Sequence, residues 1–118
     1  AYPAPANELG LARLRNNRLT QYVRYHGFSD HTSYDEVGAY VGVAAVGAGA
    51  AILERHIRLP QTSPTNPDYL HSSDPLEFRI YVEAVRIAET VLYGDLGLDM
   101  DSAPSEELMK KYRVRETP

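Results

Sequence analysis

An apolar run from residue 37 to residue 53, VGAYVGVAAVGAGAAIL, constrains the fold of this chain more than any other feature. It holds seventeen residues and no charged side chain. As a helix with a rise of about 1.5 Å per residue it would be about 25 Å long, at the short end of what crosses a hydrocarbon core of about 30 Å. The run therefore predicts a single membrane span.

The composition of this run indicates that the span packs against other helices. Gly and Ala supply ten of its seventeen residues. The Val, Ile and Leu residues would contribute only about −2 to −3.5 kcal/mol to insertion, so the span would be marginal without protein neighbours. The alternative is a helix buried inside a soluble protein, which the length of the run also allows.

Small residues recur along one side of the expected helix. Gly38, Gly42, Ala45 and Gly49 are spaced by four, three and four residues, which places them on one stripe. Gly38 and Gly42 form a GxxxG pair, the pattern that lets two helices approach closely in a membrane. We therefore expect these residues to pack against a neighbouring span, and Gly42→Leu to loosen the assembly.

The segments on either side of the run complete an all-α prediction. We expect an extended N-terminus and a weak amphipathic helix in residues 1–33, a Gly/Ala-rich membrane-spanning helix in residues 34–59, and an extramembrane region in residues 60–118. Ser33 and Glu36 form a capping-box pattern before the span, and Pro60 follows its end. The predicted fold class is all-α, with a single transmembrane helix, an amphipathic extramembrane helix and extended Pro-rich segments.

A second helix is predicted over residues 75–93. Asp74 is placed as its N-cap, Pro75 as its first residue, Glu77 as the partner in a capping box, and Gly94 as the stop. One face of this helix is apolar, and we expect it to dock on a partner protein. This docking face consists of Ile80, Ala84, Ile87, Ala88 and Val91. A further short helix is expected over residues 104–112.

The histidines do not form a recognisable metal-binding pattern. No two of them share the i,i+4 spacing that builds a metal site on a helix, and the chain has no Cys to supplement them. We therefore interpret all four as surface or interface residues, and we expect no metal, cofactor-binding or catalytic residue. The four are His26, His31, His56 and His71.

Acidic residues gather near His31. Asp30, Asp35 and Glu36 could in principle form an acid-base group or a cation site, but helix capping explains Asp35 and Glu36 more simply. The formal net charge of −4, without a long basic cluster, argues against nucleic acid as a partner. The sequence also lacks the common phosphate-binding and nucleophile motifs, so we do not expect an enzyme.

The overall layout is similar to that of single-pass accessory subunits of energy-converting membrane complexes. This resemblance implies a non-catalytic subunit that braces the core of a mitochondrial inner-membrane respiratory-chain complex. The alternatives are an accessory subunit of ATP synthase or of a thylakoid photosystem, or a soluble helical adaptor. Its partners would be other subunits and membrane lipid, with no nucleic acid, cofactor or small-molecule substrate. Because the chain starts with Ala1 rather than Met, we also expect a removed targeting segment.

Overall fold

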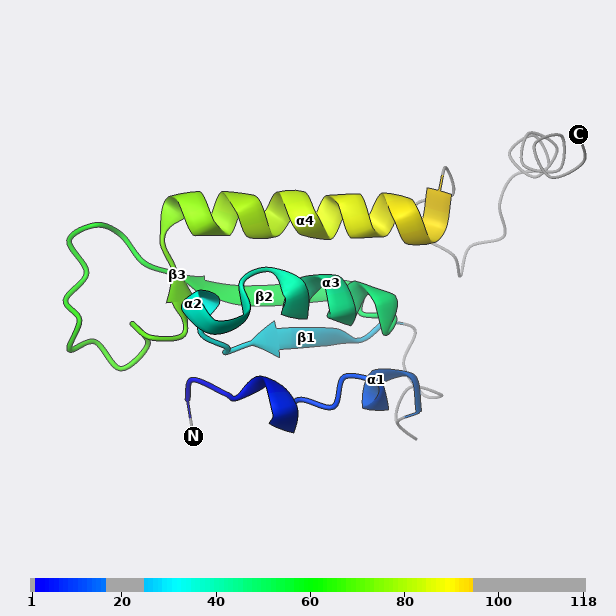
Figure 1. The fold of residues 1–118 in the computed structure, drawn as a ribbon, viewed down its shortest axis with the longest axis horizontal. Helices are drawn as coiled ribbons and strands as arrows, with labels where there is room; N and C mark the ends of the chain where they lie inside the picture. Colours follow the sequence, from blue (N-terminus) through cyan, green and yellow to red (C-terminus); the bar gives the residue numbers. More distant parts are fainter. Residues whose placement is uncertain (1, 17–24, 95–118) are drawn as a thin grey trace, which may run out of the picture.

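The structure is a computed structural model that describes residues 2–16 and 25–94. The described residues form both helices and strands, so the all-α prediction is wrong (Figure 1). A 3-10 helix η1 (Ala6–Glu8) and a short helix α1 (Arg13–Asn16) precede strand β1 (Gly27–Asp30). Helices α2 (Tyr34–Val37) and α3 (Tyr40–Gly47) follow, and then strands β2 (Ile52–Ile57) and β3 (Ser72–Ser73) and helix α4 (Pro75–Tyr93).

The three strands form one parallel sheet in the order β1, β2, β3. Parallel neighbours need a crossover connection, and helices α2 and α3 supply it between β1 and β2. The register pairs Asp30 with Arg55 and His56 with Ser72. The strands therefore end at one edge of the sheet, close to the loop that joins β2 to β3 and to the start of α4 (Figure 1).

The apolar run does not form one helix. Helix α2 ends at Val37, Gly38 turns the chain at a φ of +54°, and α3 ends at Gly47 before a second turn in which Gly49 has a φ of +96°. The last two residues of the run belong to β2. Within the described residues, no helix combines the length and the apolar character needed to cross a membrane, so the predicted span is wrong.

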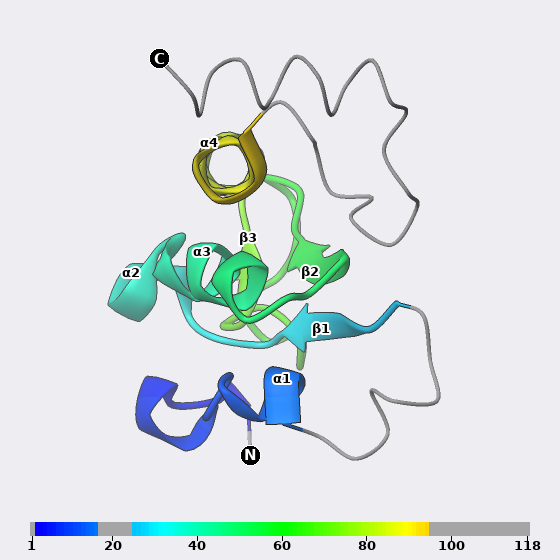
Figure 2. The same ribbon diagram turned by 90° about the vertical axis from the view of Figure 1, so that its right-hand side faces the viewer.

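Burial inside the protein explains the apolar character of the run. Val41, Ala45, Val46, Ala48 and Ala50 are all buried. Val41, Ala45 and Val46 belong to α3, which packs against β1 and runs beside α4 in both views of the ribbon (Figures 1 and 2). Small side chains suit a helix packed closely against its neighbours, because backbones can then approach each other. The alternative of a helix buried within its own protein is thus closer to the observed fold.

Helix α4 confirms the predicted helix over residues 75–93. The Asp74 side chain accepts a hydrogen bond from the Glu77 amide at 2.8 Å, and the Glu77 side chain accepts one from the Asp74 amide at 2.9 Å. Pro75 occupies the first position, and Gly94 ends the helix at a φ of +60°. Local sequence signals therefore define both ends of this helix.

The other predicted elements have mixed outcomes. The helix that follows Ser33 does begin at Tyr34, but Ser33 makes no side-chain capping bond. Of the weak helix expected in the N-terminal part, the structure shows η1 and α1, which lie beside β1 in both views (Figures 1 and 2). Residues 17–24 and the short helix expected over residues 104–112 lie outside the described residues.

The predicted small-residue stripe is divided among different elements. Gly42 and Ala45 lie in α3, whereas Gly38 and Gly49 lie in the turns on either side of it. A Cβ atom on Gly42 would be 2.6 Å from Cζ of Tyr81, so Gly42 does allow close helix packing, but against α4 of the same chain.

The docking of the apolar face of α4 on a partner protein stays a prediction. Its larger side chains are exposed and its two alanines are half-buried. The exposed members are Ile80, Ile87 and Val91, and the half-buried members are Ala84 and Ala88.

Candidate functional site

Three histidines that are far apart in the sequence converge at the edge where the strands end. His31 directly follows β1, His56 is the penultimate residue of β2, and His71 directly precedes β3. The three ring centroids form a nearly equilateral triangle with sides of 5.1, 5.1 and 5.2 Å. One nitrogen from each ring lies within 4.8 Å of the other two. We call these three residues the histidine cluster.

Each ring of the histidine cluster has one nitrogen near an oxygen atom of its own chain. Nδ1 of His31 is 3.3 Å from the Ser29 carbonyl oxygen. The Asp68 carboxylate lies beside the other two rings. Its Oδ1 is 3.1 Å from Nε2 of His71, and its Oδ2 is 3.8 Å from Nδ1 of His56. A partner on one nitrogen orients the ring and leaves the second nitrogen free to bind a ligand.

His71 is the most buried member of the cluster. Only 2% of its surface is exposed, and its Nδ1 has no hydrogen-bond partner among the described residues. Burial lowers the pKa of His71 below the ordinary value of 6.5, and the neighbouring His31 lowers it further, whereas the hydrogen bond that His71 donates to Asp68 opposes this shift. His71 is therefore neutral at pH 7, which is the protonation state that binds a metal ion.

The donor set fits a divalent transition metal ion. Three neutral imidazoles suit Zn²⁺, Ni²⁺, Fe²⁺ and related ions, and three protein ligands leave room for water or substrate. Metal–nitrogen bonds of about 2.1 Å in a tetrahedral site place the nitrogens about 3.4 Å apart. Binding a metal ion would therefore draw the three rings together from a nitrogen separation of up to 4.8 Å. The buried Nδ1 of His71 without a partner is a second feature that such a ligand would satisfy.

The face of the sheet that carries the cluster continues as a polar surface. Side chains alternate between the two faces of a strand, so Glu54 shares a face with His56, and Ser29 shares one with His31. The Ser29 hydroxyl donates a hydrogen bond of 2.7 Å to the Glu54 carboxylate. Hydroxyl and carboxylate groups thus adjoin the three imidazoles.

The N-terminal segment covers one side of the cluster. The Tyr2 ring stacks on the His31 ring with centroids 4.3 Å apart and planes inclined by 23°. Tyr2 is also 5.3 Å from the ring of His71. The Ala4 amide donates a 2.8 Å hydrogen bond to the His31 carbonyl oxygen, which holds this segment at the end of β1.

Behind the cluster lies a buried network of charged and hydroxyl groups. Asp30 has no exposed surface, and Arg55 of the neighbouring strand is 8% exposed. Nη1 of Arg55 lies 3.2 Å from Oδ1 of Asp30. The Tyr81 hydroxyl of α4 donates a 2.8 Å hydrogen bond to Oδ2 of the same carboxylate. The network therefore joins β1, β2 and α4.

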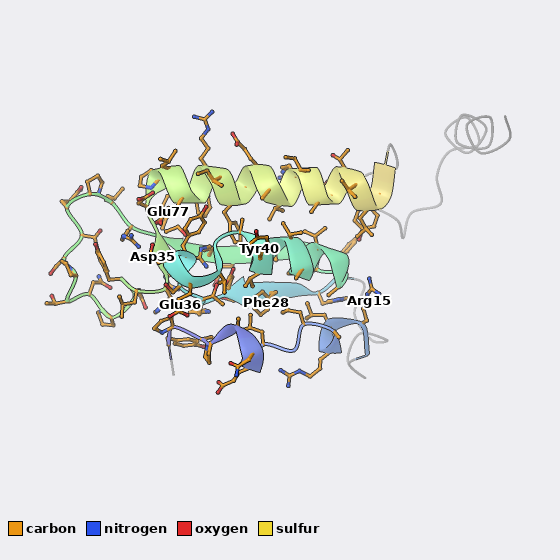
Figure 3. The ribbon with its side chains drawn as sticks, in the orientation of Figure 1. Arg15, Phe28, Asp35, Glu36, Tyr40 and Glu77 are labelled. Carbon is orange, nitrogen blue, oxygen red and sulfur yellow. The ribbon has the colours of Figure 1, made fainter. Side chains whose placement is uncertain are left out.

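The acidic residues that lie near His31 in the sequence occupy two different places in the structure. Asp35 and Glu36 lie in α2, at the same end of the molecule as Glu77 in the first turn of α4 (Figure 3). Asp30 instead belongs to the buried network. Sequence reasoning missed the histidine cluster because it tested helical spacing, whereas a parallel sheet brings these residues together. The signal present in the sequence is that Asp30 directly precedes His31 and Arg55 directly precedes His56.

Comparisons with known proteins link the chain to enzymes that make sugar acids. A family model described as the NeuB family matches residues 1–96. The N,N'-diacetyllegionaminic acid synthase of Legionella pneumophila is 36% identical over 91 residues, which cover 77% of this chain and 24% of that protein. The N-acetylneuraminate-9-phosphate synthase of Homo sapiens is 41% identical over 66 residues, which cover 56% of this chain and 17% of that protein.

A solved structure matches the fold along almost the whole chain. It is the crystal structure of spore coat polysaccharide biosynthesis protein E from Chromobacterium violaceum, with a TM-score of 0.65 and 29% sequence identity. The match covers 96% of this chain and 31% of that one. The fold is part of a TIM-barrel-like domain. The chain spans about a quarter of the length of the synthases from Legionella pneumophila and Campylobacter jejuni that it matches.

These matches overturn the functional expectations from the sequence. A non-catalytic accessory subunit of a respiratory complex, ATP synthase or photosystem is wrong, because the family match is to synthases. The expected partners, other membrane subunits and lipid without a small-molecule substrate, are wrong for the same reason. The mitochondrial inner membrane and the thylakoid membrane were inferred from the span alone, and that location is wrong as well.

Proposed function

Because the chain belongs to the NeuB family, we propose that its histidine cluster is part of the active site of a sugar acid synthase. The substrates would be phosphoenolpyruvate and an amino sugar, joined in an aldol-type condensation. His31, His56 and His71 would together hold a divalent metal ion.

One observation carries this proposal, the convergence of the three imidazoles at the carboxyl end of a parallel sheet. In TIM barrels the catalytic groups lie at that end of the strands, on the segments that follow them. His31 and His56 occupy such positions at the ends of β1 and β2. A structural histidine needs no such neighbours, whereas a metal site requires several donors within a few ångströms.

The proposed reaction defines what the site has to accomplish. The methylene carbon of phosphoenolpyruvate forms a bond to the carbonyl carbon of the amino sugar, water supplies an oxygen to the former enol carbon, and inorganic phosphate leaves. A divalent ion, when bound, would supply a Lewis acid for the carbonyl oxygen of the amino sugar. The contribution of this chain is to hold three imidazoles in place, with Asp68 beside His56 and His71.

The experiment compares two His→Ala variants of the full-length protein. Phosphate release from phosphoenolpyruvate and N-acetylmannosamine is measured after treatment with a chelator and after return of Zn²⁺, Mn²⁺ or Co²⁺. We expect chelation to abolish turnover and the metal to restore it. His56→Ala should lower kcat/KM by at least about 100-fold, because even the outer partners of metal ligands cost about 10–100-fold.

His26→Ala is the matched control, because His26 lies at the opposite end of β1 from the cluster. It should keep turnover and metal binding near those of the unmodified protein. Full turnover in His56→Ala, or turnover that survives complete removal of metal, would contradict the proposed role of the cluster.

A further inference from the structure

We propose that the buried Asp30 carboxylate, fixed by Arg55 of β2 and Tyr81 of α4, positions the three histidines for metal binding. The inference rests on the proposed function, since it concerns the same cluster. It assigns a positioning role to residues whose described hydrogen bonds do not involve the three imidazole rings.

The Asp30 side chain fixes the backbone on both sides of His31. Asp30 directly precedes that histidine, and Oδ1 accepts hydrogen bonds from the Thr32 amide at 2.9 Å and the Thr32 hydroxyl at 2.7 Å. Both Asp30 and Thr32 are at most 1% exposed. His31 is therefore held between two residues that are bonded to each other inside the protein.

The Arg55 guanidinium extends the same network to the other two histidines. Arg55 directly precedes His56, and its Nε donates a 2.7 Å hydrogen bond to the hydroxyl of Ser73. Ser73 lies two residues after His71, in β3. Nη2 of Arg55 donates to the Thr32 carbonyl oxygen at 3.0 Å, and Nη1 faces Asp30. One side chain thus ties together the three segments that carry the cluster.

The alternation of side chains along the strands separates this network from the ligand site. Residues i and i+1 of a strand point to opposite faces, so Arg55 and His56 lie on opposite sides of the sheet. Arg55 is buried toward α4, with its guanidinium carbon 5.3 Å from the centroid of the Tyr81 ring. The network acts on the histidines through the backbone and would not contact a bound metal ion.

Tyr81 is the part of the network most distant from the cluster in sequence, and it belongs to α4. Its hydroxyl donates to Oδ2 of Asp30, while Oδ1 serves Thr32 and Arg55, so all the polar groups around this carboxylate are hydrogen-bond donors. Burial raises the pKa of Tyr81, and the Asp30 charge raises it further, so the hydroxyl remains protonated and donates at neutral pH. Tyr81 therefore couples the packing of α4 to the geometry at the end of β1.

The test is a titration of the full-length protein with Co²⁺ alone, followed by visible absorption, because the spectrum of this ion reports coordination geometry. Tyr81→Phe removes one hydroxyl and keeps the ring. We expect it to weaken Co²⁺ binding about 10-fold, the lower end of what outer partners of metal ligands contribute, and to change the absorption spectrum. Ser73→Ala removes the acceptor of Arg55 Nε on another element and should act in the same direction.

Val85→Ala is the matched control for a loss of stability. Val85 lies in α4 one turn after Tyr81 and packs against the same glycine of α3, but its side chain has no polar atom. It should lower the melting temperature and leave Co²⁺ affinity and the spectrum unchanged. Unchanged Co²⁺ binding in both Tyr81→Phe and Ser73→Ala, or an equal loss in Val85→Ala, would overturn the positioning role.

The unmodified protein separates this inference from the proposed function. If it binds no Co²⁺, the metal site itself is wrong, and the positioning role fails with it. If it binds Co²⁺ and the two network variants bind equally well, only the positioning role fails.

Discussion

The contact between Gly42 and Tyr81 allows a sharp test of the packing of α3 on α4. A Cβ atom on Gly42 would lie 2.6 Å from Cζ of Tyr81, 2.8 Å from its hydroxyl and 2.9 Å from Cγ2 of Val85. Gly47 lies in the same helix, and a Cβ atom there would have no neighbour within 4 Å. The same substitution, Gly→Ala, should therefore have opposite effects at the two positions.

Three contributions set the expected change in the free energy of unfolding. Alanine in place of a helical glycine gains about 0.5–1 kcal/mol of stability at either position. At Gly42 the Tyr81 ring must move by about 1 Å to restore a normal separation, and such overpacking costs about 1–3 kcal/mol. A shift of that size also breaks the 2.8 Å hydrogen bond from Tyr81 to Asp30, which costs a further ~1.5–3 kcal/mol. The net effect of Gly42→Ala is a loss of about 3 kcal/mol, whereas Gly47→Ala should be neutral or gain up to about 1 kcal/mol.

Urea unfolding followed by circular dichroism measures both variants. For a slope of about 1.5 kcal/mol per M, Gly42→Ala should lower the midpoint by about 2 M, and Gly47→Ala should leave it unchanged or raise it slightly. Equal midpoints for the two variants would refute the reasoning, because both would then lie in open surroundings. A loss of stability in Gly42→Ala would also show that Gly42 serves packing within its own chain, because Tyr81 and Val85 belong to that chain.

Two further predictions concern stability. The lowered pKa of His71 means that the folded protein binds fewer protons than the unfolded chain just below pH 6.5, so the metal-free protein should lose urea resistance as the pH falls from about 7.5 to 5.5. His71→Gln should remove that part of the pH dependence, and a midpoint that rises on acidification would contradict the assignment. Asp74→Ala should lower the free energy of unfolding by about 1 kcal/mol, since the Glu77 amide loses its acceptor. Asp74→Asn should keep most of the stability, because an asparagine side chain also caps a helix. Equal melting temperatures for the two variants would count against the cap.

Helix α4 could be predicted from the sequence because its signals are local. The capping partners Asp74 and Glu77, Pro75 at the first position and Gly94 after the last turn all act within a few residues of the helix ends. These interactions do not depend on how the rest of the chain folds. The start of α2 at Tyr34 also agrees with the sequence, although the Ser33 side chain makes no capping bond there.

The apolar run was misread because hydropathy averages over residues that the backbone separates. Gly38 and Gly49 have positive φ values and interrupt the helix, and a hydropathy window does not detect such turns. The sequence analysis did not predict strand β2 for a different reason. Its buried positions include Arg55, while Ile52 on the opposite face is 62% exposed, so the strand lacks the usual alternation of buried apolar and exposed polar residues.

The histidine cluster depends on strand pairing, and this is why its members look unrelated in the sequence. The register pairs Asp30 with Arg55, an offset of 25 residues, and the separation of His31 and His56 is also 25 residues. The second register pairs His56 with Ser72, so His71 lies one residue before the partner of His56. No spacing rule for a single helix or a single loop contains these offsets, because they are set by the length of the helical crossover and of the loop between β2 and β3.

The same offset explains why a charged pair and a histidine pair occur together. If Asp30 and Arg55 face each other across two parallel strands, the residues that follow them also become neighbours, on the opposite face of the sheet. The buried ion pair has opposite charges and excludes other registers, because a slip of one residue would leave each charge buried without a partner, at a cost of several kcal/mol. The interactions that select the register of β1 and β2 therefore also select the pairing of His31 with His56. A chain that loses the Asp30–Arg55 pair should lose the geometry of the cluster before it loses helix α4, whose capping bonds are made by Asp74 and Glu77 instead.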